Sequence, residues 1–244
     1  LEWGEPAGEL IVLVHGFLDQ AYSWKFFVAE LLKKVRQPLR IIAPDCRGHG
    51  DSGWVGDGGY YHFPDYVYDL DCVITALDAA RFHLVGHSMG GTISFLYAGT
   101  FPQRIGKLIL IEGVGPVGVE FADAPRKMAG WIGELHERGR KHFREYTRVE
   151  AGANQLQQTN PRLKKEFAID LARAGMKQHD KGKWVWKFDP LHRTAAPQPF
   201  YTAQALEFFR RIACPVLIVD GQESRQTHRT DKQERYYAIR DRRL

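Results

Sequence analysis

Apolar residues in the first half of the chain follow two alternating patterns. Short unbroken runs rich in Val, Ile and Leu, typical of buried strands, lie at 9–16, 39–45, 81–86 and 107–113. Between these runs, apolar residues recur at steps of three and four, which predicts helices over 22–34, from Pro64 to Leu77, and over 90–101. Strands and helices in alternation indicate an α/β fold, a mostly parallel sheet with helices on both faces.

The pattern changes in the middle of the chain, where residues 114–200 show no clear strand. The elements predicted from there on are helices at 124–148, 162–176 and 202–211 and a strand at 214–221. The last strand returns to the first pattern, so we expect one sheet domain formed by 1–116 and 201–244. Residues 117–200 are then an inserted, mostly helical cap, and the last twenty residues are partly helical.

Composition narrows the class of protein. The 244 residues are 44% apolar, which suits one large domain with an insertion. No apolar run approaches the ~20 residues that a membrane helix needs, so no membrane partner is expected. Cys46, Cys72 and Cys214 are too few and too far apart for a disulfide framework or a zinc site, which favours a reducing, cytoplasmic location. The chain begins at Leu1, so a signal peptide ahead of it stays open.

Charge is uneven along the chain. Residues 121–195 hold 16 Lys and Arg against 9 Asp and Glu, a net charge of +7, whereas residues 1–120 hold 9 against 14, a net charge of −5. The basic residues of the cap alternate with acids at helical spacing, which favours a solvated helical face over a nucleic-acid site. Whether this charge attracts an anionic substrate stays open.

The stretch Gly86-His87-Ser88-Met89-Gly90 lies between a predicted strand and a predicted helix. A serine at such a sharp turn is lifted above the sheet edge, and small neighbours let the backbone cross closely. The helix N-terminus beneath it favours developing negative charge. Ser88 is therefore the candidate nucleophile, with an ordinary turn serine as the alternative.

Two backbone N–H groups are candidates for the oxyanion hole. His15-Gly16-Phe17 follows the first predicted strand, and the residue after such a pair commonly faces the nucleophile. The N–H groups of Phe17 and Met89 would then hold the oxyanion. We expect His15 to support the neighbouring loop, although it is a rival for the catalytic base.

The sequence supplies a well-placed candidate for the catalytic acid but only a poorly placed one for the catalytic base. Glu112 ends an apolar strand, where a carboxylate needs a reason, so we favour it as the acid. A structural buried acid at this position, or Asp220 or Glu223 as the catalytic acid, are the alternatives. The order serine, acid, histidine leaves only His228, which lies in a polar stretch with no strand after it. We therefore expect the catalytic histidine outside these 244 residues.

The other histidines fit less well. His49, His62 and His83 precede the serine, and His192 lies in the cap. His136 and His142 are six residues apart, which is not the spacing of a metal-binding pair on a helix.

Taken together, HGFLD, DCRGHGDS, GHSMGG, LILIEGVGP and CPVLIVDG resemble the α/β-hydrolase superfamily, and are closest to its serine hydrolase-like branch. WKFDPLHR is similar to that branch too. The resemblance implies a sheet that begins with two strands, with this chain entering near the end of the second, and one more strand and helix after this chain's last strand. It thus implies a chain trimmed at both ends. It also implies an aspartate where this sequence has Ser224, and a serine nucleophile rather than the aspartate of haloalkane dehalogenases and epoxide hydrolases.

The expected function is hydrolysis of a carboxylic ester or related acyl bond of a small molecule, through an acyl-enzyme on Ser88. We expect no cofactor, no metal and no nucleic-acid partner, and the oligomeric state is open. Carbon–carbon bond hydrolysis or cofactor-free oxygen chemistry on the same fold is an alternative. A catalytically inactive binding protein is another, should the natural chain end at Leu244.

Overall fold

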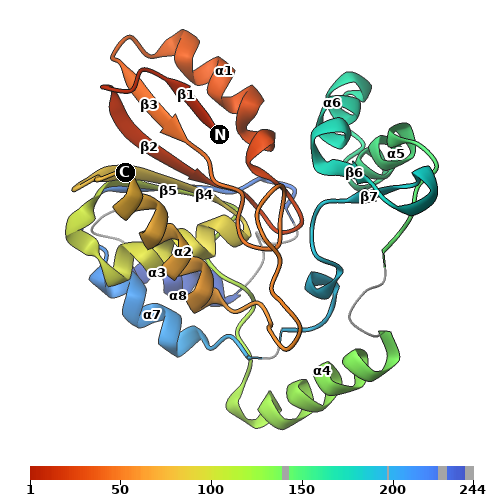
Figure 1. Cartoon of the computed structure of the whole chain (residues 1–244). Coiled ribbons are helices and arrows are strands. Elements are labelled where there is room, and N and C mark those ends of the chain that lie inside the picture. The colour runs from red at the N-terminus through yellow and green to blue at the C-terminus, as the bar shows by residue number, and fades with distance from the viewer. Residues whose placement is uncertain (139–142, 197, 225–229, 240–244) are drawn as a thin grey trace.

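The computed structural model describes residues 1–138, 143–196, 198–224 and 230–239 (Figure 1). Six strands form one sheet in the order β1-β3-β2-β4-β5-β8. They are β1 (Glu2–Gly4), β2 (Glu9–Val14), β3 (Leu39–Ile42), β4 (Phe82–His87), β5 (Ile105–Ile111) and β8 (Val216–Val219). All neighbouring strands are parallel except β1, which pairs antiparallel with β3. The mostly parallel sheet is confirmed.

β1 precedes the first run that the apolar pattern predicts, at 9–16, in the place where the resemblance implies the end of an earlier strand. It spans three residues, of which only Trp3 is partly buried, so it carries too few apolar positions to show a period. Its position is fixed by pairing, because Glu2 faces Ile42 and Gly4 faces Arg40 across the two strands.

Helices cover both faces of the sheet. On one face lies α1 (Lys25–Lys34), whose Val28 packs with Leu13, Ile41 and Val85 of the strands. The other face carries α2 (Phe63–Ala76), α3 (Met89–Thr100), α7 (Thr202–Arg211) and α8 (Thr230–Ala238) (Figure 1). Short 3-10 helices lie at Ala21–Trp24, Pro102–Arg104, Phe121–Asp123, Asp180–Gly182 and Pro190–Arg193. The predicted helices of the sheet domain are confirmed to within a few residues.

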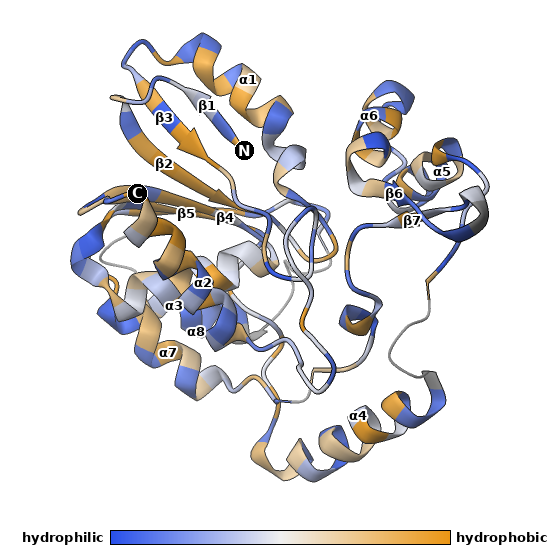
Figure 2. Ribbon diagram, in the orientation of Figure 1, coloured by the Kyte–Doolittle hydropathy of each residue, from blue (hydrophilic) through white to orange (hydrophobic). Residues whose placement is uncertain are grey.

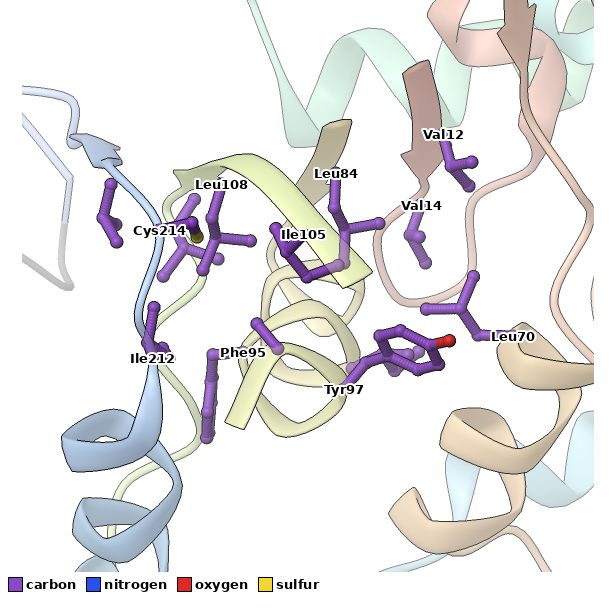
Figure 3. Packing of buried hydrophobic residues seen from close by; sticks show 14 of the residues in the cluster. Val12, Val14, Leu70, Leu84, Phe95, Tyr97, Ile105, Leu108, Ile212 and Cys214 are labelled. Atoms are coloured by element: carbon purple, nitrogen blue, oxygen red, sulfur yellow. The ribbon is translucent and has the colours of Figure 1, made fainter. Parts of the chain in front are cut away.

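The larger hydrophobic core lies between the sheet and the helices α2, α3 and α7 (Figure 3). Figure 2 shows the strands β2, β3, β4 and β5 of this sheet as largely apolar. Ten of the twelve residues of α3 are buried, and the ring of Phe95 stacks on that of Phe209 of α7 at 4.2 Å between centroids. Burial of apolar surface is the main stabilising contribution, so α3 is anchored along its length and the turn before it is held in place.

The middle segment holds α4 (Ala124–Arg138), α5 (Val149–Thr159), α6 (Lys165–Gly175), and the antiparallel strands β6 (Met176–Gln178) and β7 (Trp184–Trp186). The expectation of no strand here is wrong. The two strands escape prediction because each spans three residues, too few to show a pattern of apolar positions. The helix predicted over 124–148 ends at Arg138 within the described residues, and Tyr146 instead bridges to Trp184.

The helix α5 went unpredicted because its buried face includes the small residues Gly152 and Ala153. A Cβ on Gly152 would lie 2.3 Å from the sulfur of Met176 in β6, so α5 lies too close to this residue for a large apolar side chain at position 152. This segment has a hydrophobic core of its own, which includes Tyr146, Ala168 and Met176. The separate core supports the proposed cap at 117–200, whose boundaries stay a prediction.

Candidate active site

Ser88 lies at the turn between β4 and α3, the context that the sequence predicts for a nucleophile. Its φ is 51° and its ψ −112°, a left-handed conformation that costs a non-glycine residue on the order of 1–3 kcal/mol. The Ser88 N–H donates to the carbonyl of Ile111 at 2.9 Å, and the Thr92 N–H donates to the carbonyl of Ser88 at 3.2 Å. Hydrogen bonds to β5 and α3 therefore hold the strained Ser88 in place.

The glycines on either side of Ser88 are required by close backbone approach. A Cβ on Gly86 would lie 2.3 Å from the carbonyl oxygen of Gly90, and a Cβ on Gly90 would lie 2.1 Å from that of Val14. No side chain fits at such distances, so the turn can form only with glycine at both positions.

The two candidate oxyanion donors come from the loop after β2 and from the start of α3. Phe17 follows β2, and the hydrogen bonds among the described residues include none from its N–H. Met89 is the first residue of α3, and the N–H of a first helical residue has no acceptor within its own helix. A Cβ on Gly16 would lie 3.5 Å from the Cβ of Ser88, so the loop that carries Phe17 lies against the nucleophile.

Two buried histidines hold this loop. Nδ1 of His15 lies 2.8 Å from the carbonyl oxygen of Gly16, and Nε2 of His15 accepts a hydrogen bond from the Cys46 N–H at 2.9 Å. These contacts of a buried ring support the structural role expected of His15. Nε2 of His49 accepts the N–H of Leu18, whose φ is 57°, at 3.2 Å. Burial lowers the pKa of His49 to about 2, so the ring is neutral and can accept this bond.

Glu112 is the residue directly after β5, and its φ of 52° is left-handed like that of Ser88. Its N–H donates to the carbonyl of Val219 at 2.9 Å. Its carboxylate accepts the N–H of Gly221 and the Ser224 hydroxyl, the latter at 2.8 Å. The acid therefore lies where the ends of β5 and β8 meet.

The rival acids have other partners. The Asp220 carboxylate accepts a hydrogen bond from Nζ of the buried Lys232 at 2.9 Å and another from the Tyr236 hydroxyl. Glu223 pairs with Arg162, and both of those side chains are more than three-quarters exposed. Of the three candidates, only Glu112 lines a cavity together with Ser88.

That cavity has a volume of about 800 Å³, within the range of small-molecule sites. Ser88, Glu112, Phe17 and Met89 all line it, so the structure brings together the four residues singled out from the sequence.

Tyr61, which lines this cavity, makes a contact that sequence reasoning missed. The Tyr61 hydroxyl donates to the carboxylate of Asp189 at 2.7 Å, across 128 residues of chain. Asp189 belongs to the stretch WKFDPLHR, so the resemblance of that stretch was the one available signal.

Two described histidines line the cavity, His62 at the start of α2 and His192. The ring of His192 lies between those of Tyr61, at 3.8 Å, and His49, at 4.2 Å, and burial lowers its pKa to about 4. His142 and His228 lie outside the described residues.

Within the described ranges, no group of three or more His, Cys, Asp or Glu side chains is arranged to hold a metal ion. No helix in those ranges is both long enough and apolar enough to pass through a membrane.

Comparison with known proteins places this chain among relatives. It is 29% identical over 184 residues to a serine hydrolase-like protein of Danio rerio, covering 74% of this chain and 55% of that protein. The chain spans about half the length of the curated relatives it matches.

Solved structures give the same result. A hypothetical protein from Pseudomonas aeruginosa PAO1 superposes with a TM-score of 0.88 at 30% identity, covering 100% of this chain and 84% of the other. A thioesterase domain from the curacin biosynthetic pathway superposes with a TM-score of 0.86 at 27% identity, covering 99% and 85%. Residues 11–243 also match the description of the alpha/beta hydrolase family, and this chain therefore belongs to that family.

Proposed function

We propose that the protein is a serine hydrolase that cleaves a carboxylic ester or a related acyl bond of a small molecule. The observation that carries the proposal is the strained Ser88 at the N-terminus of α3, facing one cavity with Phe17 and Met89. Similarity to a thioesterase domain over nearly the whole chain supports the acyl class of substrate.

In the first step, the Ser88 hydroxyl attacks the substrate carbonyl and loses its proton to a base. The tetrahedral oxyanion accepts hydrogen bonds from the N–H groups of Phe17 and Met89. The alcohol or thiol then leaves with the proton from the base, and an acyl-enzyme remains. Water then attacks the acyl-enzyme with the help of the same base. This step releases the carboxylic acid product and restores the Ser88 hydroxyl.

The base in this proposal is a histidine outside the described residues, because the order serine, acid, histidine requires a position after β8. Glu112 orients that histidine and stabilises its charged form. The mechanism uses protein groups alone, so we propose no cofactor. Lys127 of α4 lines the cavity, which supports a wall contributed by the cap.

We also propose a cytoplasmic location. Cys46, Cys72 and Cys214 are too few and too far apart in the chain for a disulfide framework, which suits a reducing compartment.

The test is labelling and turnover of the full-length protein. We expect a fluorophosphonate to modify Ser88 and the enzyme to hydrolyse p-nitrophenyl butyrate. Ser88→Ala abolishes both, whereas Ser23→Ala, a serine on the 3-10 helix before α1, changes neither. A Ser88→Ala protein that turns over the ester as fast as the wild type would overturn the proposal.

A further inference from the structure

The cavity at Ser88 continues along the outer face of α3. Four residues of this helix line it: Met89, Thr92, Leu96 and Thr100. Their spacing of three and four residues places them on one helical face. From Met89 to Thr100 the helix rises about 16 Å. The cavity is therefore an elongated groove with the nucleophile at one end.

The walls of this groove are apolar. Opposite α3 they come from α2, α7 and the segment before α7, namely Phe63, Val67, Phe200, Ala205 and Phe208. The rings of Phe63 and Phe200 meet edge to face at 5.9 Å between centroids. The hydroxyl of Thr100 donates to the carbonyl of Leu96 at 2.8 Å, so its hydrogen-bonding need is met within the helix. Among the described residues that line the cavity, Glu112 and Lys127 are the carboxylate and the ammonium groups.

The direction of the groove separates the two halves of an ester. Because β4 and β5 are parallel, α3 between them runs back from the carboxyl ends of the strands. Glu112 lies at those carboxyl ends, directly after β5. The leaving group must stand near the acid-oriented base, from which it receives its proton. The acyl part then points the other way, along α3.

From this geometry we infer that the groove binds the acyl chain of the substrate, an unbranched chain of about twelve carbons. This inference rests on the proposed function. Three backbone bonds of an extended chain cover about 3.6 Å, so a methylene chain advances ~1.2 Å per bond, and the carbon–carbon bonds of a dodecanoyl group extend over ~13 Å, most of the ~16 Å of the groove. Thr100 is exposed, so the groove opens to solvent at its far end, where longer chains protrude.

The test is a series of p-nitrophenyl esters from acetate to hexadecanoate. We expect kcat/KM to rise by up to about fourfold per added methylene, the transfer equivalent of one buried CH₂ group, and to level off near dodecanoate. Leu96→Trp blocks the groove midway and lowers the dodecanoate-to-butyrate ratio by at least about tenfold. Leu32→Trp, an exposed leucine of α1 on the other face of the sheet, leaves the ratio unchanged.

The remaining outcomes separate this inference from the hydrolase proposal. Turnover of butyrate that depends on Ser88 but shows no gain with chain length overturns the groove alone. A preference for dodecyl acetate over dodecanoyl esters, lost in Leu96→Trp, overturns the acyl assignment.

If no ester is hydrolysed, binding still decides the matter. Calorimetry with the Ser88→Ala protein and methyl dodecanoate should show binding that Leu96→Trp weakens at least about tenfold, and equal binding in the two proteins overturns the inference.

Discussion

The hydroxyl of Ser224 donates a hydrogen bond to the carboxylate of Glu112 at 2.8 Å. The two residues follow β8 and β5, the two strand ends that compete for the acid in the sequence. Glu112 is thus paired with a neutral hydroxyl at this junction, while the carboxylate of Asp220, directly after β8, accepts a hydrogen bond from Lys232. The hydroxyl at position 224 donates a hydrogen bond to this carboxylate of Glu112, whereas a carboxylate at position 224 would repel it.

Removing the charge of Glu112 is expected to reduce catalysis without unfolding the protein. Glu112→Gln keeps the size and one acceptor of the side chain but loses the charge that would stabilise a protonated histidine. We expect kcat to fall by about 10²–10⁴, as for a triad acid replaced by its amide. Glu223→Gln, in an exposed pair with Arg162, is the matched control. Equal activity losses in the two variants would contradict the assignment.

Moving the acid across the junction is a sharper test. Because the Ser224 Oγ lies 2.8 Å from the Glu112 carboxylate, an aspartate at position 224 places its charge close to the original one. The double variant Glu112→Gln with Ser224→Asp should recover at least about tenfold of the activity lost in Glu112→Gln. Ser224→Asp alone should be less active than the wild type, because two carboxylates then share one site. Steady-state kinetics on p-nitrophenyl butyrate measure both, and no recovery in the double variant would place the acid elsewhere.

Long apolar runs made most of the sheet predictable. The strands β2 to β5 each bury two or more Val, Ile or Leu side chains, and such burial leaves a continuous apolar run. The strand β8 buries Val216 and is also a continuous apolar run. In contrast, β1, β6 and β7 are three residues long and are fixed by pairing with distant segments. The burial of α5 depends on Gly152 and Ala153, whose small size is a requirement of close packing that apolar periodicity does not register.

The candidate site divides in the same way. Ser88, Met89 and Phe17 were found because a strand-to-helix turn and a strand end can be read from nearby residues. The contact of Glu112 with Ser224 joins residues 112 apart, and that of Tyr61 with Asp189 residues 128 apart. Such pairs depend on the order of strands in the sheet and on the fold of the middle segment, which one sequence does not supply.

Adding a single methyl group at the turn should destabilise the fold. Gly90→Ala places a Cβ 2.1 Å from the carbonyl oxygen of Val14, and the close approach of β2 to α3 must then be lost. We expect the free energy of unfolding to fall by about 2–4 kcal/mol. Gly133→Ala, on α4 with no atom within 4 Å, is the matched control and should be neutral or stabilising by about 0.5–1 kcal/mol. Urea denaturation of both variants measures the difference, and similar changes in the two would refute the argument.

The buried His192 predicts loss of stability in mild acid. Burial lowers its pKa to about 4, whereas in the unfolded chain it titrates near the ordinary histidine value of about 6.5. Between these pH values His192 binds a proton in the unfolded state but not in the native state. The free energy of unfolding therefore rises as the pH rises and falls as the pH falls. The full effect of this residue is about 3 kcal/mol, present above pH ~6.5 and lost by pH ~4. Urea titrations across this window should show a shallower slope for His192→Gln than for the wild type. His136→Gln, which replaces an exposed histidine of α4, should keep the wild-type slope, and a His192→Gln slope as steep as that of the wild type would exclude His192 as the source of acid sensitivity.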